Sequence, residues 1–391
     1  MNRVIATGWG YLRGDKMIWM IVIFLFILSM LAVYSATGTL AYKMQVDNES
    51  YLLKQIAISI VGLLIMFGFH LVDYKYYSRI AQLLWYISIP LLIYTMIFGL
   101  TLNGALRSIR LPVIGLTFQP SDLAKVALIM FLARQLSLMQ ERTAPFKEVF
   151  IQILIPVGLT CLLIARDNLS TALILYFTSV FVMFIGRIAF KNMAILFGAS
   201  LIFAVIFIMV LHVVPEDTLR QYSKRAVIWK HRIDDFAVGL RGKKVNFEED
   251  YQVQQAKIAI AKGGLFKINP GGSDQRNFLP EAYNDFIYVI IIEEYGLFGG
   301  VCVVLLYLLL LYRCIRIVIK APKAFGALLA VGLGIALVTQ AMINMAVAVN
   351  LLPVTGVTLP LVSMGGSSVI FTSIAFGIIL SVSKNIESEE G

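Results

Sequence analysis

Long apolar stretches alternate with short polar segments along almost the whole chain. A helix needs about 20 apolar residues to cross the hydrocarbon core of a bilayer. The alternation therefore predicts membrane-spanning helices, and the first is expected to be retained because no small-residue cleavage site follows it. The predicted spans are residues 17–36, 53–72, 80–101, 121–138, 149–165, 169–186, 192–214, 285–312, 324–349 and 358–383.

One long polar segment, residues 215–284, interrupts this alternation. It is much longer than a simple connection between two helices. Within it, residues 251–261 have the pattern of a helix that Gly263 and Gly264 stop. Pro280 suits the first turn of a helix. We therefore predict that the eighth helix begins near residue 280 and carries Asp285 in its second turn.

The composition leads to the same fold class. Of the 391 residues, 59% are hydrophobic, and the mean hydropathy of +0.83 is far above that of a soluble domain. We predict an all-α, polytopic membrane protein with about ten transmembrane helices and one large extracytoplasmic loop. The whole chain, residues 1–391, is expected to form a single membrane domain that includes the loop 215–284.

The distribution of Lys and Arg predicts the orientation of the chain, because cytoplasmic loops carry an excess of these residues. With the N-terminus inside, five cations fall in the opposite short loops: Lys43, Lys54, Arg107, Arg110 and Arg166. Fifteen fall at cytoplasmic ends: Arg3, Arg13, Lys16, Lys75, Arg79, Arg134, Arg142, Lys147, Arg187, Lys191, Arg313, Arg316, Lys320, Lys323 and Lys384. Both termini are therefore expected in the cytoplasm, and the loop 215–284 outside.

The net charge of +10 follows from the same excess of cations. This positive charge favours contact with anionic lipid headgroups, and no nucleic-acid partner is expected. The three cysteines and three histidines are scattered singly, without the spacing of a metal site or a disulfide framework.

Several polar residues fall within or beside the predicted spans, where ionisable groups are costly and usually functional. Asp285 is the foremost candidate, although composition alone gives equal weight to an acid that complements a helix N-terminus. Lys125 lies about a turn inside a span, which favours a cavity, whereas Arg107 could simply reach the interface. Gln340 and Asn344 are one turn apart and predict hydrogen bonds between helices.

Four other polar residues have competing interpretations. Glu281 is four residues before Asp285, and helix capping and a functional role have similar weight. Glu293 and Glu294 are expected to hold helices together. Ser363 stands among glycines in a stretch that invites close packing or a broken helix, with cavity lining as the lesser alternative.

Several sequence motifs around these polar residues resemble those of the SEDS family, the multispan enzymes of bacterial shape, elongation, division and sporulation. The resemblance runs from the first span to the last, and the order and spacing of the motifs make it specific. The motifs are Asn103-Gly104-Ala105 with Arg107, Gln119-Pro120-Ser121 with Ala124-Lys125, Tyr251-Gln252 with Gln255, Gly263-Gly264-Leu265-Phe266, Leu279-Pro280-Glu281-Ala282 with Asp285-Phe286-Ile287, Glu293-Glu294-Tyr295-Gly296, and Leu352-Pro353 before Leu359-Pro360-Leu361-Val362-Ser363.

The resemblance implies a peptidoglycan glycosyltransferase that polymerises lipid II into glycan strands. Asp285 matches the family's catalytic acid, and a carboxylate can take the proton of an acceptor hydroxyl. Arg107 and Lys125 are candidates to stabilise the leaving pyrophosphate. A divalent cation, Mg²⁺ or Mn²⁺, is a further candidate, and no organic cofactor is expected. Gln119, Glu281 and Ser363 complete the set of expected substrate-binding residues.

The chain departs from the family pattern at several positions. The usual His-Thr before the catalytic Asp is Tyr283-Asn284, and the usual Trp after the Arg is Ser108. The acidic motif before the sixth span reads Arg166-Asp167-Asn168, and Thr355 replaces a Lys that is frequent in the division branch. These departures affect individual binding contacts and leave the acid in place.

Within the family, Thr358 and Ser368 resemble the division branch more than the elongation branch. The resemblance implies a single-span, class B penicillin-binding transpeptidase and other divisome membrane proteins as partners. It places the protein in the bacterial inner membrane, at the division septum. Two alternatives remain: an elongation-type glycosyltransferase, and a flippase that moves the lipid-linked precursor across the membrane.

Overall fold

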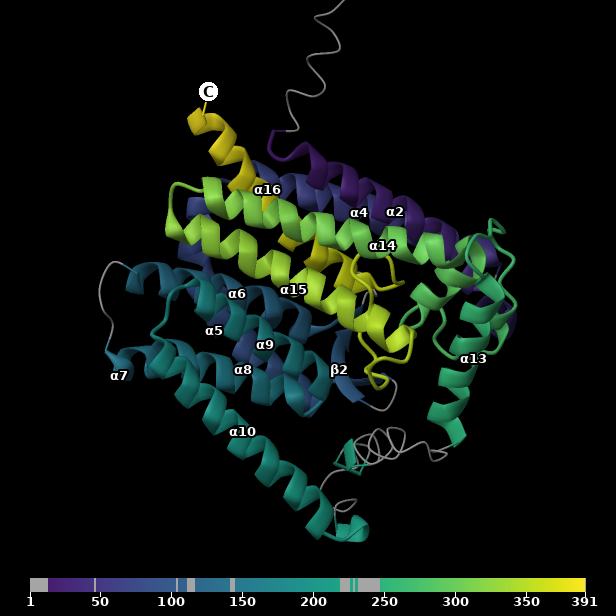
Figure 1. The fold of residues 1–391 in the computed structure, drawn as a ribbon, viewed down its shortest axis with the longest axis horizontal. Helices are drawn as coiled ribbons and strands as arrows, with labels where there is room; N and C mark the ends of the chain where they lie inside the picture. Colours follow the sequence, from purple (N-terminus) through teal and green to yellow (C-terminus); the bar gives the residue numbers. More distant parts are fainter. Residues whose placement is uncertain are drawn as a thin grey trace, which may run out of the picture.

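The computed structural model describes residues 13–45, 47–102, 105–110, 117–140, 145–218, 226–227, 229–230 and 247–390. Long helices run side by side through the body of the molecule, and α13 lies at one end of it (Figure 1). The helices are α2 (Lys16–Ala36), α3 (Gly38–Met44), α4 (Asn48–Leu71), α5 (Tyr74–Phe98), α6 (Pro120–Met139), α7 (Phe146–Val149), α8 (Ile155–Ala165), α9 (Leu169–Ile185), α10 (Phe190–Val213), α13 (Phe247–Gly263), α14 (Ile287–Lys320), α15 (Ala324–Ala348) and α16 (Gly366–Glu390), with a π-helical turn, Phe150–Leu154, between α7 and α8 and a 3₁₀ turn at Gln275–Asn277.

Every stretch predicted to span the membrane contains a helix. Among the described residues, eight helical segments are long and apolar enough to cross a bilayer. The other two predicted spans differ for physical reasons: α9 has only 17 residues, and α6 has 20 residues but carries Asp122, Lys125 and Arg134. The polytopic, helical fold class is thus confirmed.

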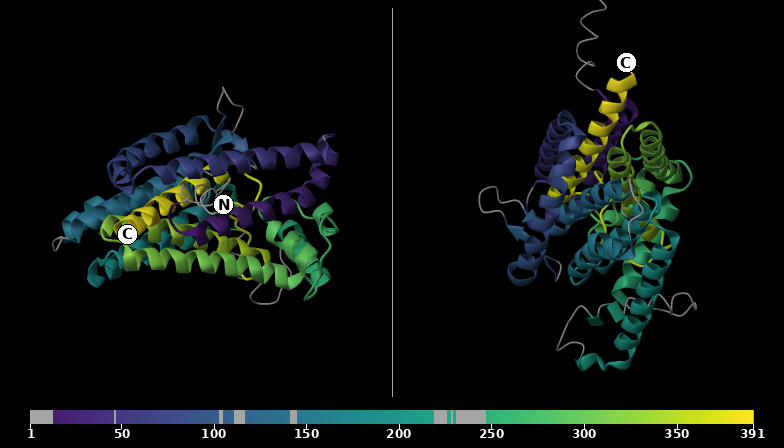
Figure 2. Two further views of the ribbon diagram at one scale, coloured as in Figure 1. Left: turned by 90° about the horizontal axis from the view of Figure 1, so that it is seen from above. Right: turned by 90° about the vertical axis from the view of Figure 1, so that its left-hand side faces the viewer.

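The helices differ greatly in how deeply they are buried. In α16, 67% of the most apolar stretch is buried, whereas in α10 the share is 6%. Helix α10 diverges from the other helices, and α16 passes among them (Figures 1 and 2). The apolar surface of α10 is therefore available to lipid, and the interior around α16 is where polar side chains can meet away from lipid.

A small antiparallel sheet between α5 and α6 was not predicted. Its strands are β1 (Leu100–Leu102), β2 (Ala105–Arg110) and β3 (Thr117–Phe118), in the order β1-β2-β3. The strands are too short to show a clear alternation of apolar and polar residues. The sheet pairs backbone groups of a segment that leaves the helical bundle.

The predicted start of the eighth helix near residue 280 is wrong. Residues 280–286 form successive turns, which we call the Asp285 turn, and α14 begins at Ile287. Glu281 has a φ of +56°, a left-handed conformation that does not continue an α-helix. Asp285 therefore precedes the helix rather than lying in its second turn.

Helix α14 is also interrupted within its length, at Gly296, which has a φ of +71°. The N–H groups of Leu297 and Phe298 donate to the carbonyl oxygens of Gly264 and Leu265 at 2.9 and 3.1 Å. The segment that follows α13 therefore supplies the backbone partners that the break removes from the helix.

The tenth helix begins at Gly366, eight residues later than the predicted start at 358, because residues 351–365 are not helical. Side chains of three helices donate hydrogen bonds to carbonyl groups of this segment. The donors, paired with their acceptor carbonyls, are Asn344 with Val357 (2.6 Å), Gln340 with Thr358 (3.0 Å), Tyr307 with Pro360 (2.5 Å) and Ser29 with Val362 (2.8 Å).

Candidate functional site

The Asp285 turn lies against a cavity of about 440 Å³ inside the bundle. Glu281, Tyr283 and Asn284 line this cavity directly. Its other polar lining comes from α4, β2, β3, the start of α6, the α8–α9 junction, α15, the 351–365 segment and the start of α16. These residues are Lys54, Ser108, Thr117, Gln119, Asp122, Lys125, Asn168, Thr171, Gln340, Thr358, Ser367 and Ser368.

Asp285 lies beside the cavity, next to the 351–365 segment. Gly356 has a φ of +65°, and a Cβ atom at this position would lie 3.4 Å from Oδ2 of Asp285. Gly356 itself lines the cavity. The backbone of the 351–365 segment therefore approaches the carboxylate closely at the cavity wall, where a residue other than glycine would be strained.

Lys125 lines the cavity as part of a polar cluster. Its Nζ lies 2.9 Å from Oδ1 of Asp122 on the same face of α6 and donates to Oε1 of Gln340 at 3.3 Å. The hydroxyl of Ser367, at the start of α16, donates to Oδ2 of Asp122 at 3.3 Å. The cation is thus fixed between α6, α15 and α16, as the predicted interhelical role of Gln340 requires.

Pro120 begins α6, as expected for a residue that lacks a backbone N–H and is tolerated in the first helical turn. Gln119 precedes it and donates through Nε2 to the hydroxyl of Ser121 at 2.8 Å. Gln119 and Asp122, in the first turn of α6, line the cavity together with the Asp285 turn.

Ser363 does not line the cavity. Its side chain is 3% exposed; its hydroxyl accepts from the N–H of Leu359 at 2.8 Å and donates to the carbonyl of Asn284 at 2.7 Å. Asn344, predicted to join helices, donates to the carbonyls of Asp285 at 2.9 Å and Val357 at 2.6 Å. Both side chains therefore act on backbone at the Asp285 turn.

Tyr283 occupies the position of the family's usual His. Burial, with the negative charge of Glu281 beside it, raises the pKa of Tyr283 to about 12. The phenol therefore stays neutral at physiological pH, unlike a histidine, which would titrate there. Compared with the family's usual His, this residue leaves the cavity wall without a group that titrates near neutral pH at this position.

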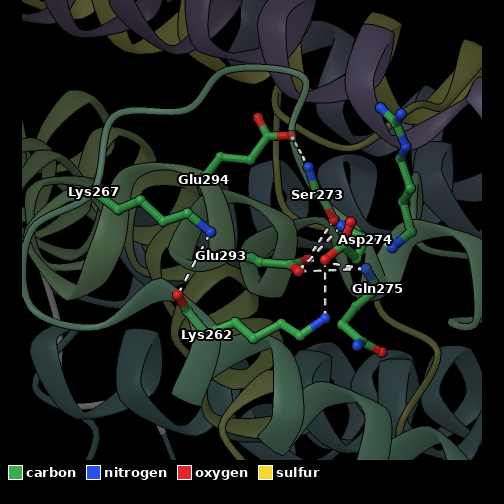
Figure 3. Close-up of polar contacts among 8 residues, drawn as sticks. Lys262, Lys267, Ser273, Asp274, Gln275, Glu293 and Glu294 are labelled. Atoms are coloured by element: carbon green, nitrogen blue, oxygen red, sulfur yellow. Dashed lines mark hydrogen bonds and ion pairs between the residues drawn. The ribbon is translucent and has the colours of Figure 1, made fainter.

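Two adjacent acids of α14 hold the loop between α13 and α14 onto the bundle (Figure 3). Glu293 accepts hydrogen bonds from the Ser273 hydroxyl and from the N–H groups of Asp274 and Gln275 at 3.2 and 3.3 Å. Both glutamates are 1% exposed. Glu293 thus fixes the loop that leads into the Asp285 turn.

Glu294 extends this connection to a second helix. It accepts from the N–H of Ser273 at 3.3 Å and from the hydroxyl of Ser35 in α2. Arg276 donates to the carbonyls of Ser35 at 3.2 Å and Gly271 at 3.0 Å. The prediction that these acids hold helices together is therefore confirmed for Glu294, which joins α14 to α2. Glu293 instead holds loop residues 273–275.

Within the described parts of the chain, no group of three or more His, Cys, Asp or Glu side chains is placed to hold a metal ion. The cavity has two carboxylates, Asp122 and Glu281, and Asp122 is paired with Lys125. Carboxylates in this number bind Mg²⁺ when a substrate phosphate supplies further oxygen ligands.

The predicted substrate residues thus fall into three groups. Gln119, Lys125 and Glu281 line one cavity, and Ser363 lies behind the Asp285 turn. Arg107 belongs to β2, but its side chain lies outside the described residues.

Lys54 and Asp122 line the cavity but were not predicted to belong to the site. Asp122 carried a signal, because it is three residues before Lys125 and would share a helical face with it. Lys54 carried none, since its distance from the other site residues in sequence hides its place in the fold.

Comparisons with known proteins point to one family. The sequence profile of the FtsW/RodA/SpoVE cell cycle proteins matches residues 15–388. The probable peptidoglycan glycosyltransferase FtsW of Geobacter sp. (strain M18) is 32% identical over 373 residues, 94% of this chain and 96% of that protein. Stage V sporulation protein E of Bacillus subtilis (strain 168) is 31% identical over 377 residues, 95% of this chain and 97% of that protein.

A solved structure has the same fold. It contains a chain of a peptidoglycan synthase complex, studied for the structural coordination of polymerization and crosslinking. That chain superimposes with a TM-score of 0.72 at 23% identity, over 95% of this chain and 98% of its own length.

Proposed function

Because the chain belongs to the FtsW/RodA/SpoVE family of cell cycle proteins, we propose that it is a peptidoglycan glycosyltransferase that polymerises lipid II at the division septum. The observation that carries this proposal is the position of Asp285 beside a cavity that also holds Lys125. A base and a cation at one cavity are what transfer of a sugar from a pyrophosphate donor requires.

In the proposed reaction, Asp285 acts as the general base. The acceptor hydroxyl attacks the anomeric carbon of the donor sugar, and its proton passes to the carboxylate of Asp285. The bond between the anomeric carbon and the pyrophosphate oxygen breaks as the new C–O bond forms. The electron pair of that bond leaves with the polyprenyl pyrophosphate. Attack with inversion of the anomeric carbon needs a single base, which matches one essential Asp.

Negative charge grows on the pyrophosphate as it leaves, and cations lower the energy of that state. Lys125 is the cavity cation fixed by neighbouring side chains, and Lys54 reaches the cavity from α4. Arg107 is proposed as a third cation at the leaving group. A divalent cation, Mg²⁺ or Mn²⁺, would offset further phosphate charge, with Glu281 as the carboxylate that would hold it.

The remaining cavity residues suit the sugars. Gln119 and Glu281 are proposed to bind the polar groups of lipid II, and Gln119 has both a donor and an acceptor for them. Ser363 is proposed to act on the turn rather than on the substrate, because its hydroxyl is already bonded at both donor and acceptor sites.

The division assignment is supported by the similarity to the protein named FtsW and by the residues at 358 and 368. The hydroxyls of Thr358 and Ser368 lie 3.3 Å apart, and both residues line the cavity. The residues that distinguish the division branch from the elongation branch thus meet at the proposed substrate site.

We further propose that both termini are cytoplasmic and that the loop 215–284 lies outside. The C-terminal end of α16 and helix α13 lie at opposite ends of the molecule (Figure 1), which supports this topology. The similarity to a chain of a synthase complex supports a partner, proposed here to be a single-span, class B penicillin-binding transpeptidase that acts with other divisome membrane proteins.

Purified protein in detergent, supplied with lipid II, tests the proposal. We expect glycan polymer, with more of it when the cognate transpeptidase is added, even after mutation of the transpeptidase's active serine. A flippase needs two membrane sides, so it would give no polymer in detergent and would move lipid II only in vesicles. No polymer with or without the transpeptidase, together with lipid II movement in vesicles, would contradict the proposal.

A further inference from the structure

Residues 280–286 precede α14, and within this turn the N–H groups of Asn284 and Asp285 donate to the carbonyl of Glu281 at 2.9 and 3.2 Å. Other donors to its backbone come from elsewhere in the chain. The hydroxyl of Ser363 donates to the carbonyl of Asn284 at 2.7 Å, and the amide of Asn344 donates to the carbonyl of Asp285 at 2.9 Å. These bonds reach two consecutive peptide groups, one on each side of the Asp285 Cα atom.

A third bond extends the series to the preceding residue. The N–H of Met364 donates to the carbonyl of Tyr283 at 3.0 Å. Three consecutive carbonyl groups of the turn are therefore bound, two of them by residues 363 and 364. This pattern fixes the peptide planes around the acid, since each bond restrains the rotation of one carbonyl.

Asn344 connects the turn to the 351–365 segment as well. The same Nδ2 donates to the carbonyl of Val357 at 2.6 Å, and the residue is 1% exposed. One buried amide group of α15 therefore joins the two backbone segments that meet at the carboxylate, where Gly356 approaches Oδ2 of Asp285.

We infer that Asn344 and Ser363 are positioning residues that fix the Asp285 carboxylate for proton abstraction, a role that rests on the proposed glycosyltransferase function. Neither side chain reaches the cavity, so each acts through the turn. Misplacement of a reacting group by about 1 Å costs on the order of 100-fold in rate. Loss of either side chain should therefore lower kcat and leave the binding of lipid II unchanged.

The test uses the full-length protein with its partner transpeptidase and lipid II. We compare Asn344→Leu, which keeps a branched shape without donors, and Ser363→Ala, which deletes one oxygen. We expect kcat to fall about 100-fold for Asn344→Leu and about 10-fold for Ser363→Ala, with KM within about threefold of the wild type. Asn344→Gln, which retains an amide donor, should recover part of the loss.

Two controls separate positioning from folding. Ser381→Ala removes a serine that donates to the carbonyl of Val72 near the other end of α16, and it should leave kcat unchanged. Each positioning variant is also combined with Asp285→Asn. If the residues act through the carboxylate, they should lower the residual rate of Asp285→Asn by less than twofold, whereas damage to the fold would lower both backgrounds equally.

The outcomes distinguish this inference from the proposed function. The positioning role alone would be overturned if Asp285→Asn makes no polymer while folded Asn344→Leu and Ser363→Ala both keep the wild-type kcat. Full activity of Asp285→Asn would overturn the general-base role of Asp285 and the positioning role with it, whereas the absence of polymer from the wild-type protein would overturn the proposed function. If Asn344→Leu fails to fold, Ser363→Ala alone decides the question. The inference is contradicted if Ser363→Ala has the wild-type kcat, or if it lowers the rate equally in the wild-type and the Asp285→Asn proteins.

Discussion

Lys125 and Asp122 form an ion pair at the cavity wall, with 2.9 Å between Nζ and Oδ1 across one turn of α6. The lysine also donates to Gln340, so its charge is held at one place in the cavity. A cation fixed in this way needs little reorganisation when negative charge develops on a leaving pyrophosphate.

Replacement of Lys125 by Met should lower kcat/KM for lipid II by about 10- to 100-fold, the equivalent of a charge-assisted hydrogen bond worth about 1.5–3 kcal/mol. The measurement is the initial rate of polymerisation against lipid II concentration. Lys323→Met, in the exposed connection between α14 and α15, is the matched control and should behave as the wild type.

The double variant Asp122→Asn with Lys125→Met decides between two roles for the lysine. If Lys125 only neutralises Asp122, removing both charges should restore the rate, and the pyrophosphate assignment is wrong. We expect the double variant to remain at least as impaired as Lys125→Met.

The pH dependence of kcat tests the replacement of the family's His by Tyr283. Because burial and Glu281 raise the pKa of Tyr283 to about 12, the phenol stays neutral over about pH 5–9 and adds no inflection there. Activity should fall only on the acid side, where protonation removes the base. Tyr283→Phe should keep this profile, and Tyr283→His should add an inflection between about pH 5 and 8.

The same series shows what would count against this account of Tyr283. A wild-type profile with an inflection near neutral pH that disappears in Tyr283→Phe would mean that the tyrosine titrates in the working range.

Replacement of Glu293 by Gln should loosen the loop between α13 and α14. The carboxylate accepts from Ser273, Asp274 and Gln275, and bonds to a charged group contribute about 1.5–3 kcal/mol. We expect faster hydrogen exchange in residues 264–279 and a lower thermal midpoint. Lys262→Ala, which breaks an exposed ion pair with Asp274, should change both little; equal effects of the two variants would refute the role of Glu293.

Topology can be measured with introduced cysteines in intact cells. Ile268→Cys replaces a side chain that is 88% exposed in the loop, and Lys323→Cys lies at the other end of α14. An impermeant maleimide should label Ile268→Cys before lysis and Lys323→Cys only after it, with the parent protein as background. The reverse order would place the site on the cytoplasmic side and remove the access of an external enzyme.

The long helices were predictable from sequence because an apolar stretch of bilayer length leaves the backbone few alternatives to a helix. The hydrogen bond between Gln340 and Lys125 of α6 was predictable for a related reason, since an amide within a span needs a partner on another helix. Asn344 was expected to join helices in the same way, but it donates to the non-helical backbone of Asp285 and Val357. The helix that ends at Gly263 and Gly264 followed from its stop signal.

The local geometry of the site was not predictable. The left-handed conformation of Glu281 and the late start of α16 at Gly366 depend on tertiary partners such as Asn344 and Ser363, which sequence spacing does not reveal. Pro280 and the apolar run after it favour a helix by local propensity. Residues 280–286 form turns instead, and these turns are bonded to residues 363 and 364.

The central claim is that the carboxylate of Asp285 removes a proton during glycan polymerisation. Its most direct test is the polymerisation rate of Asp285→Asn, which keeps the size of the side chain but removes the base, measured with lipid II and the partner transpeptidase. The account predicts a loss of at least about 100-fold, with unchanged lipid II binding and thermal stability. Glycan synthesis at the wild-type rate by folded Asp285→Asn protein would contradict it.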